Sequence, residues 1–326
     1  MHRRSNATVL PDQGTKGRPI RIAVVGVGSL GQHHARVCAD LPGAALAGVF
    51  DTDRDRADAV AVQHGCPAFQ HLRDLLPEAD AVTVAVPTVD HHRLARVLLE
   101  AGKDVLVEKP ICSTLAEAED LIRLARERSL ILQVGHIERF NPATEVLRAN
   151  AVRPRFIEVH RLGAFSPRSL DVDVVLDLMI HDLDIVLSLD GSEAVQVDAV
   201  GVPVLTPRVD IANARLRFAS GLIANLTASR VSAERVRKFR VFSPRTYISV
   251  DFAAREAQVH RLADGPDGPE IQSERTAAPD EEPLRRQLAA FVAAVRDRSE
   301  PVVSGADGLR ALALAHEILA RMADHK

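Results

Sequence analysis

Residues 20–31 read IRIAVVGVGSLG, an apolar run that leads directly into three closely spaced glycines, Gly26, Gly28 and Gly31. The run is apolar at nearly every position, which is typical of a buried parallel strand. Glycines at this spacing permit a tight turn and let a pyrophosphate approach the N-terminus of the following helix. The stretch therefore predicts the first strand, loop and helix of a dinucleotide-binding fold.

An acidic residue completes this pattern. Asp51 closes the second predicted strand, residues 44–50, and lies 20 residues beyond Gly31. A carboxylate at this position accepts hydrogen bonds from an adenosine ribose and repels a 2′-phosphate, so NAD is favoured over NADP, although Arg54 and Arg56 weaken that preference. The alternative is a glycine turn needed only for packing the helix on the sheet. The cofactor-binding residues predicted here are Gly26, Gly28, Ser29, Leu30, Gly31 and Asp51.

Up to residue 141, short β-branched runs alternate with longer amphipathic segments. The strand-like runs cover residues 20–25, 44–50, 81–86, 104–107 and 131–134. Repeated strand and helix units predict a doubly wound parallel sheet of the Rossmann type, so the fold class is α/β.

After Pro142 the pattern changes. One helix-like stretch, 174–189, precedes closely spaced runs, several of which alternate polar and apolar residues; a turn-rich loop at 264–269 and two helices, 283–298 and 307–323, follow. This predicts an α+β domain with an open-faced, mostly antiparallel sheet. The strand-like runs are 155–162, 195–205, 211–218, 222–229, 238–243, 247–252 and 257–262. The predicted division is a disordered basic tail (1–19), an NAD-binding domain (20–141) and a domain for substrate binding and oligomerisation (142–326).

The composition excludes several classes of protein. The 326 residues hold 41 Lys+Arg against 44 Asp+Glu, a net charge of -3, which argues against a nucleic-acid binder. Ten Phe, one Tyr and no Trp are too few for an aromatic stacking platform. The three cysteines form no CxxC, and the chain shows neither a membrane-length apolar run nor the apolar core of a signal peptide. We expect a soluble cytoplasmic protein.

Two further predicted strands end in residues that point to the same crevice, because ligands of doubly wound sheets bind at the carboxyl ends of the strands. One strand ends in Pro87 and Thr88, and the other in Glu108, Lys109 and Pro110. The further cofactor-binding residues predicted here are Pro87, Thr88, Glu108 and Lys109. A lysine there can stabilise the alkoxide that develops as a substrate hydroxyl loses its proton. The alternative is a solvated lysine in a loop.

Asp177 and His181 lie four residues apart in the predicted helix and share one of its faces. A histidine has a pKa near the operating pH and suits proton transfer, while Asp177 can bind or orient the reacting group. The alternative is an ordinary surface pair of a helix. The pair also has metal-ligand spacing, but no third ligand stands at a suitable distance in the sequence, so no metal is predicted.

Together these motifs resemble the Gfo/Idh/MocA oxidoreductases. The matching elements are the glycine loop at 26–31, the Glu108-Lys109-Pro110 segment, and Asp177 with His181 on the helix after the domain crossover. The resemblance implies NAD-dependent oxidation of a CH–OH group, with Lys109 and His181 as the catalytic pair and Asp177 assisting. One departure is that residues 171–176, DVDVVL, stand where many members have glycines.

Residues 135–142 and 166–177 resemble the branch of this family that includes UDP-N-acetylglucosamine 3-dehydrogenases. The resemblance implies oxidation of the sugar 3-hydroxyl to a ketone, which a partner aminotransferase converts to an amine for lipid A. Polar groups near the crossover can meet a diphosphate or a sugar, although each has an alternative structural role. The predicted substrate-binding residues are Arg139, Asn141, Arg161, Arg168 and His181.

Two other functions remain open at this stage. An inositol or simple-sugar dehydrogenase, or a reductase working in the opposite direction, is the main alternative within the enzyme class. A regulator that senses NAD without catalysis is the alternative outside it, although such a protein needs none of Lys109, Asp177 and His181. The open sheet face is expected to be apolar and to require a cover, which predicts a homo-oligomer, either a dimer or a tetramer.

Overall fold

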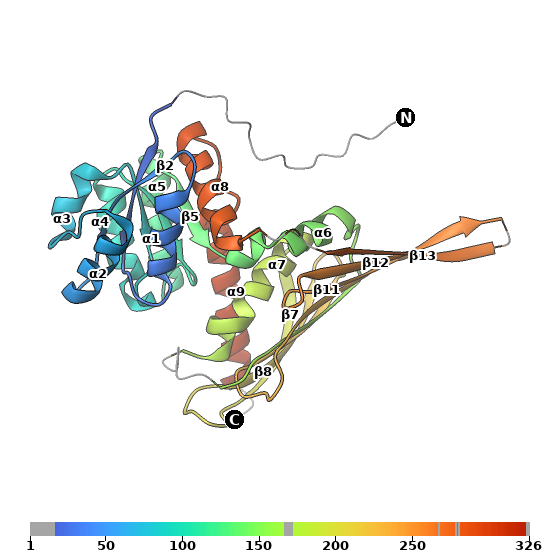
Figure 1. The fold of residues 1–326 in the computed structure, drawn as a ribbon. Helices are drawn as coiled ribbons and strands as arrows, with labels where there is room; N and C mark the ends of the chain where they lie inside the picture. The colour runs from blue at the N-terminus through green and yellow to red at the C-terminus, as the bar shows by residue number, and fades with distance from the viewer. Residues whose placement is uncertain (1–16, 166–171, 267, 278, 280, 324–326) are drawn as a thin grey trace.

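The structure, a computed structural model, describes residues 17–165, 172–266, 268–277, 279 and 281–323. Two sheets organise the chain, a five-stranded sheet from the first half and an eight-stranded sheet from the second. Figure 1 shows the two sheets side by side, with α8 and α9 between them and the β12–β13 hairpin projecting from the far end.

The first sheet is parallel throughout, with the order β2-β1-β3-β4-β5. Its strands are β1 (Ile20–Val25), β2 (Ala44–Phe50), β3 (Ala81–Val84), β4 (Asp104–Glu108) and β5 (Leu132–Gly135). Every residue of β3, β4 and β5 is buried, as the nearly continuous apolar runs predict for strands covered on both faces. The chain leaves β1 toward β2 and then returns to its other side with β3, so a ligand crevice is expected at the carboxyl end of β1.

Helices cover both faces of this sheet: α1 (Gly31–Asp40), α2 (Arg54–His64), α3 (Leu72–Leu75), α4 (His91–Glu100) and α5 (Leu115–Glu127). The start of α5 illustrates the local reason for such a helix. Thr114 Oγ1 accepts a hydrogen bond from the Glu117 amide, and the Glu117 carboxylate accepts one from the Thr114 amide. This capping box satisfies amides that have no partner within the helix. Ala118, Leu121 and Leu124 then form the buried face.

The second sheet has the order β13-β12-β11-β10-β6-β9-β8-β7, and its neighbours are antiparallel except for β6 and β9. Its strands are β6 (Phe156–Leu162), β7 (Ala194–Val202), β8 (Ile211–Phe218), β9 (Ile223–Ser229), β10 (Val236–Ser243), β11 (Thr246–Asp251), β12 (Glu256–Gly265) and β13 (Gly268–Ala277). Exposed and buried residues alternate strictly along β8, so one face is packed and the other is open. The two sheets confirm the predicted fold class.

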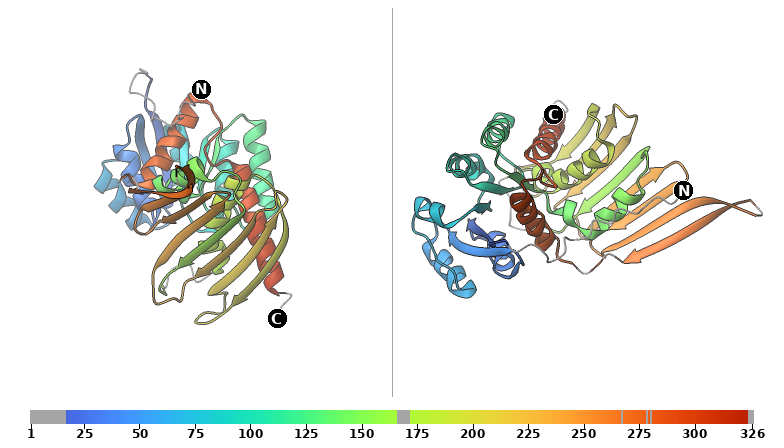
Figure 2. Two further views of the ribbon diagram at one scale, coloured as in Figure 1. Left: turned by 90° about the vertical axis from the view of Figure 1, so that its right-hand side faces the viewer. Right: turned by 90° about the horizontal axis from the view of Figure 1, so that it is seen from above.

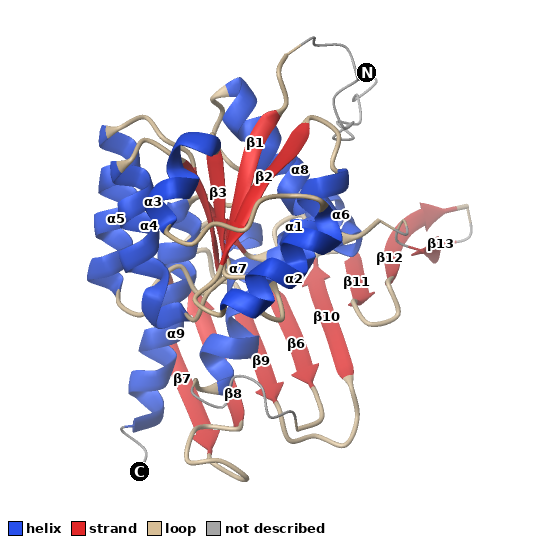
Figure 3. Ribbon diagram, turned by 60° about the vertical axis from the view of Figure 1, so that its left-hand side comes forward, coloured by secondary structure: helices blue, strands red, loops and turns tan. Residues whose placement is uncertain are grey.

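Helices α6 (Pro142–Asn150), α7 (Ile180–Asp190) and α9 (Gly305–Ala323) contribute buried residues to the packed face of the second sheet. Figure 3 shows α9 running from the first sheet along the edge of the second. Helix α8 (Pro283–Asp297) belongs elsewhere: its Leu288 and Phe291 are fully buried in one cluster with Ile22 and Leu106 of the first sheet. The boundary at 141/142 stays a prediction, but α8 completes the core of the first half.

The structure differs from the predicted elements at the far end of the second sheet. The turn-rich loop at 264–269 is instead the end of a hairpin, because β12 continues to Gly265 and β13 begins at Gly268. Strand β13 has no apolar alternation and is almost wholly exposed, so its sequence carries no strand signal. In the tail, Arg18 donates to Asp80 at 3.0 Å, whereas residues 1–16 lie outside the described part of the chain.

The open face of the second sheet is less apolar than expected. Figure 2, left, shows the strands of this sheet in front of the helices. Along β6, β10, β11 and β12 it carries a row of rings, in which Phe156, Phe242, Tyr247 and His260 follow one another at centroid distances of 5.7, 4.9 and 5.5 Å. On the same face Arg240 donates to Glu158, and Asn213 donates to Thr227. The face is therefore mixed, with an aromatic row among polar pairs.

None of the helices in the described ranges is long and apolar enough to cross a membrane.

Candidate active site

A crevice of about 730 Å³ opens at the carboxyl ends of β1, β3 and β4, as the strand order predicts. The second half of the chain contributes Val172, Leu176 and Asp177 to its wall. The predicted site residues that line it are Gly26, Gly28, Ser29, Leu30, Asp51, Pro87, Thr88, Glu108, Lys109 and Asp177. The structure thus brings together most of the predicted cofactor and catalytic residues.

The three glycines of the loop meet different needs. Gly26 has a φ of +83°, which side chains disfavour. A Cβ on Gly31 would lie 1.8 Å from the Gly26 carbonyl oxygen, so only glycine lets α1 start this close to β1. A Cβ on Gly28 would meet nothing nearer than an Arg56 nitrogen at 3.8 Å. The first and third glycines allow the tight turn. The second leaves the backbone free of a side chain, so that the pyrophosphate of a dinucleotide can approach it closely.

Asp51 is held rigidly at the rim of the crevice. Its carboxylate accepts hydrogen bonds from the backbone amides of Val27 at 2.8 Å and Asp53 at 2.9 Å. Arg56 lies 3.5 Å from the Asp51 carboxylate but only 2.9 Å from that of Asp53. The carboxylate is therefore oriented for a ribose diol, and the neighbouring cation is drawn toward a second acid.

Glu108 forms part of the buried wall of the crevice. Its carboxylate is buried, with His34 Nε2 at 3.1 Å and the Gln287 amide donating at 3.3 Å. Burial favours the neutral acid, but His34, the Gln287 amide and the charge of Lys109 together outweigh it and lower the pKa of Glu108. A Cβ on Gly135 would lie 2.5 Å from this carboxylate, so β5 needs glycine beside it. Glu108 lines the crevice while its charge is directed into the interior.

His91, which the sequence analysis did not single out, joins the two loops beside the crevice. Its ring nitrogens lie 2.8 Å from the Pro110 carbonyl oxygen and 2.9 Å from that of Val86. Burial lowers the pKa of His91, so the neutral ring donates to one carbonyl at a time. The peptide bond between Lys109 and Pro110 is cis. The contacts of His91 with both carbonyl groups hold the loops after β3 and β4 close to each other.

Lys109 meets Asp177 across the two halves of the chain. The Lys109 ammonium donates to the Asp177 backbone carbonyl at 2.5 Å and lies 3.3 Å from its carboxylate. Both side chains keep about a fifth of their surface exposed, 18% and 22%. Asp177 sits in a π-turn, Val175–Met179, directly before α7. The predicted single helix is therefore interrupted, and such turns are frequent at functional sites.

His181 follows in the first turn of α7 and is partly buried. Its Nδ1 is fully buried and has no hydrogen-bond partner in the described part of the chain. Burial, and then the charge of Lys109, lower the pKa of His181 well below its ordinary value. The ring is therefore neutral at physiological pH and able to accept a proton. Because Nδ1 is buried, Nε2 is the nitrogen that can reach a substrate.

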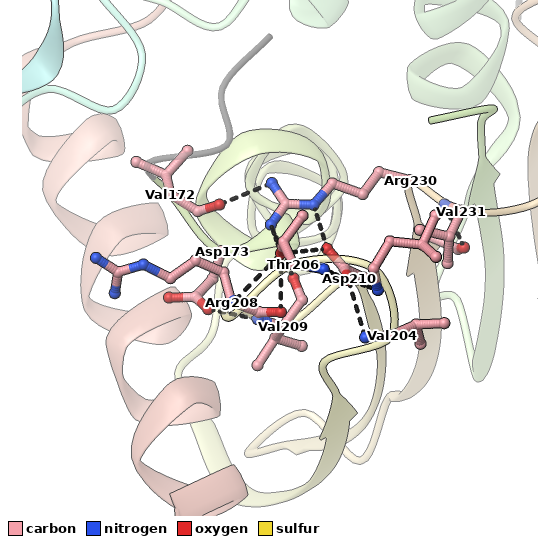
Figure 4. A network of polar contacts seen from close by, with 11 residues as sticks. Val172, Asp173, Val204, Thr206, Arg208, Val209, Asp210, Arg230 and Val231 are labelled. Carbon is pink, nitrogen blue, oxygen red and sulfur yellow. Dashed lines mark hydrogen bonds and ion pairs between the residues drawn. The ribbon is translucent and has the colours of Figure 1, made fainter. Parts of the chain in front are cut away.

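A buried ion pair holds the segment that leads to Asp177 (Figure 4). Arg230, after β9, donates to the Asp210 carboxylate at 2.8 Å and to the Val172 carbonyl at 2.8 Å. Asp210 also accepts from the amides of residues 204–206 and from the Thr206 hydroxyl. Burial opposes the charge, but these hydrogen bonds outweigh it and hold the pKa of Asp210 far below its ordinary value.

The same cluster continues toward the π-turn. The Val209 amide donates to the Asp173 carboxylate at 2.9 Å, and the Val174 amide donates to the Val209 carbonyl at 3.0 Å. Residues 172–174 are thereby fixed from two sides, immediately before the turn that carries Asp177. We refer to Asp210, Arg230 and Thr206 as the 210–230 clamp.

Three of the predicted substrate-binding residues make contacts within the protein, and their substrate roles stay predictions. The Arg161 guanidinium is buried, donates twice to Asp182 at 2.7 and 2.8 Å, and donates to Glu138 at 2.9 Å. Asn141 caps α6 through the Ala143 amide and donates to Glu138. Arg139 is buried and donates to the Val302 carbonyl. Arg161 and Asn141 are thus engaged within the junction between the sheets, whereas Nε and Nη1 of Arg139 have no hydrogen-bond partner among the described residues. Arg168 lies outside the described residues.

One residue that the sequence analysis missed is close to this junction. Arg237 of β10 is the register partner of Arg161 on β6. Its nearest charged partner is Glu138 at 3.8 Å, and 35% of its side chain is exposed. Its charge is among those that lower the pKa of His181. Only the register of the second sheet places Arg237 near His181, so no sequence motif identifies it.

The comparisons with known proteins agree with this geometry. The family model GFO_IDH_MocA, described as an oxidoreductase family with an NAD-binding Rossmann fold, matches residues 20–136, and the model of the GFO/IDH/MocA C-terminal domain matches 145–248. A UDP-N-acetylglucosamine 3-dehydrogenase from Acidithiobacillus ferrooxidans is 41% identical over 302 residues, 92% of this chain and 96% of that protein. Its solved structure has a TM-score of 0.88 and covers 94% of this chain and 98% of its own, at 39% identity. A scyllo-inositol 2-dehydrogenase (NAD(+)) from Bacillus subtilis is 30% identical over 65% of this chain and 68% of its own length.

Proposed function

Because the chain belongs to the Gfo/Idh/MocA family of NAD-binding oxidoreductases, we propose that it oxidises the 3-hydroxyl of UDP-N-acetylglucosamine to a ketone. The family assignment confirms the resemblance that the motifs indicated. The near full-length identity of 41% to a UDP-N-acetylglucosamine 3-dehydrogenase carries the choice of substrate. Lys109 and Asp177 line the crevice, and His181, which is not among the lining residues, is close enough to Lys109 for that charge to lower its pKa, which supports a catalytic role.

The residues of the first half fit the cofactor. The loop at 26–31 would hold the pyrophosphate, Asp51 the adenosine ribose, and Pro87, Thr88 and Lys109 would border the nicotinamide end of the crevice. Bound NAD+ supplies the acceptor for the hydride that leaves the substrate carbon.

Residues from both halves of the chain take part in removing the hydroxyl proton. The neutral His181 ring accepts the hydroxyl proton at Nε2, and the Lys109 ammonium stabilises the negative charge that develops on the oxygen. Asp177 keeps the Lys109 ammonium at the mouth of the crevice through its carbonyl and carboxylate. We assign Lys109 and His181 as catalytic residues and Asp177 as the residue that positions Lys109.

Arg237 is our candidate for recognising the diphosphate. In contrast to Arg161, whose guanidinium makes three hydrogen bonds, Arg237 makes none within the described residues and is partly exposed beside His181. A guanidinium in this state is suited to a phosphate. Replacing Arg237 by Gln should raise the KM for a UDP-sugar about tenfold, while the rate with an uncharged polyol, if one is a substrate, should change little.

The deciding experiment measures NADH formation by absorbance with UDP-N-acetylglucosamine, other UDP-sugars, free N-acetylglucosamine, myo-inositol and scyllo-inositol. A hydrazine trap removes the ketone and keeps an unfavourable equilibrium from hiding turnover. NMR of the product identifies the oxidised carbon. We expect turnover of UDP-N-acetylglucosamine with a ketone at C3. Turnover of an inositol alone would establish the second candidate, which the inositol dehydrogenase relative favours. NAD binding without turnover of any of these compounds would favour a regulator.

We further propose that the chain forms a homo-oligomer through the open face of the second sheet. Phe242 in the aromatic row is 37% exposed, and Val200 and Val202 at the β7 edge are 54% and 47% exposed. Apolar groups of this kind are covered when two such faces meet. Sedimentation of the wild type and of Phe242→Glu tests this proposal, because the charge should dissociate the oligomer.

A ketone at C3 can accept an amino group by transamination, in which the amine donor becomes a carbonyl compound, so we propose that an aminotransferase consumes the product. The cysteines Cys38, Cys66 and Cys112 are free thiols, which suits the cytoplasm, where we place the reaction.

A further inference from the structure

His136 lies directly behind His181. It follows β5, is 1% exposed, and meets the His181 ring edge to face, with centroids 6.1 Å apart and planes at 89°. In the described part of the chain neither of its ring nitrogens has a hydrogen-bond partner, and neither does His181 Nδ1. A second imidazole therefore stands beside the buried edge of the proposed base, and its own hydrogen-bonding groups are uncommitted.

An acid lies on the same side of α7. Asp184 is three residues after His181, so the two side chains project from one helix face. Asp184 is 2% exposed, and its Oδ2, which has no hydrogen bond among the described residues, lies 3.7 Å from Arg139 Nε. Burial lowers the pKa of His136, and the charges of Lys109 and Arg139 lower it further. Asp184 is the acid that opposes this lowering most strongly, and Glu108 opposes it more weakly.

Unpaired polar atoms in a protein interior are costly, at about 1–3 kcal/mol each. Here several of them gather at one place, around the face of the proposed base that is turned away from the substrate. Such groups in native proteins are normally linked, either through ordered water or by contacts that tighten when a substrate binds. His136 contacts the His181 ring, and the charge of Asp184 acts on His136, so the three groups together are suited to orienting an imidazole base.

We propose that His136 is a positioning residue for His181, and that together with Asp184 it keeps the proton of the neutral His181 ring on Nδ1. The Nδ1–H of His181 donates toward a His136 nitrogen, and the other nitrogen of His136 donates toward the Asp184 carboxylate, through a water molecule where the gap requires one. Nε2 of His181 is then unprotonated and available to accept the substrate proton. The same acid stabilises the imidazolium that forms.

This inference rests on the proposed function only in requiring that a hydroxyl be oxidised; it holds equally for a UDP-sugar and for a polyol. The alternative is that His136 merely fills space in the junction. The two readings differ in what a substitution does. Phe fills the same space without hydrogen bonds, whereas Gln is smaller but can donate and accept. A space-filling role is preserved by His136→Phe, and an orienting role is preserved better by His136→Gln.

The test compares full-length wild type, H136F, H136Q and D184N with saturating NAD+ and the best substrate of the panel. We expect H136F to lower kcat about 10- to 100-fold, with KM and NADH affinity changed less than about twofold. The acidic limb of its kcat profile should move to lower pH, because the imidazolium loses the support of Asp184. H136Q should recover most of kcat. Wild-type kcat in H136F, or equal losses in H136F and H136Q, would overturn the inference.

A spectroscopic measurement separates this inference from the choice of substrate. Long-range 1H–15N correlation spectra of histidine-labelled protein report which ring nitrogen carries the proton, and H181N identifies the His181 signal. We expect the Nδ1–H tautomer in wild type and H136Q, and a mixture or the Nε2–H tautomer in H136F. An unchanged tautomer in H136F would overturn the role of His136 even if UDP-N-acetylglucosamine is the substrate. Failure of every substrate in the panel would instead reject the proposed function and leave the tautomer result standing.

Discussion

The ammonium of Lys109 donates to the backbone carbonyl of Asp177 at 2.5 Å, although 68 residues separate them in the sequence. Lys109 directly follows β4 of the first sheet, and Asp177 lies in the π-turn before α7 of the second half. The contact therefore joins the two halves of the chain at the crevice. A substrate bound there meets groups from both halves at once.

Replacing Lys109 by Met should lower turnover about 100-fold or more while NADH affinity changes little, because Met keeps the length of the side chain but removes the charge that stabilises the alkoxide. NADH fluorescence measures binding, and absorbance measures turnover. Lys103→Met is the matched control, since Lys103 precedes β4 at its opposite end and donates to the Ala79 carbonyl. Wild-type turnover in the Lys109 variant would contradict the catalytic assignment.

Replacing Arg230 by Met should destabilise the protein by about 2–4 kcal/mol, because the buried Asp210 carboxylate would lose its guanidinium partner and keep only its neutral hydrogen-bond donors. Thermal unfolding measures this loss. Substrate KM should also rise, since Val172 lines the crevice and loses its bond to the guanidinium. The stability and the substrate KM of Arg230→Lys should lie between those of Arg230→Met and those of the wild type. Arg321→Met, at an exposed position of α9, should change neither quantity, and similar values for both Met variants would rule out the 210–230 clamp.

Replacing Asp53 by Asn should improve the affinity for NADPH several-fold, because Arg56 would be released from its 2.9 Å pair and could approach a 2′-phosphate. Asn retains the capping bond that the Asp53 side chain accepts from the Arg56 amide, so α2 should keep its stability. Titrations of NADH and NADPH fluorescence measure the two affinities. Asp58→Asn, which frees the exposed Arg54 instead, is the control. Equal NADPH affinity in both variants would show that Asp53 has no part in cofactor selection.

Stability should decrease as the pH falls below about 6.5. Burial lowers the pKa values of His91, His136 and His181 in the folded protein, so between the folded and unfolded values the unfolded chain binds more protons. The free energy of unfolding therefore falls on acidification through that window. Calorimetry across it should show a smaller decrease for His136→Phe than for wild type. The exposed His33→Gln serves as the control, and an identical pH dependence of all three proteins would contradict the expectation.

Replacing Phe291 by Ala should cost about 3–5 kcal/mol of unfolding free energy, because the side chain is fully buried between α8 and the first sheet. Urea unfolding measures the cost. Val62→Ala on α2 is the control, since Val62 is 84% exposed and should change stability by less than about 0.5 kcal/mol. A loss no larger than that of the control would show that α8 is not part of the first core.

Many residues of the candidate site can be predicted from local sequence. Gly26, Gly28 and Gly31 are required by backbone geometry within one turn, and Asp51 follows at the end of the next strand, so their roles can be predicted from spacing. Lys109, Asp177 and His181 stand in motifs whose order matches the family. By contrast, Arg161 and Asn141 have side chains of the kind that bind polar ligands. The sequence does not reveal that these side chains already donate hydrogen bonds to buried acids.

The sequence by itself determined the two-sheet architecture, because buried parallel strands are apolar throughout, whereas strands with one open face alternate polar and apolar residues. It also determined the glycine loop, whose chemistry is local. Only the tertiary structure decided which charges are occupied and which are available, since that depends on contacts between distant segments. It placed Arg237 opposite Arg161, His136 behind His181, and α8 on the first sheet. No local pattern encodes these relationships, because each arises from the packing of elements more than 40 residues apart.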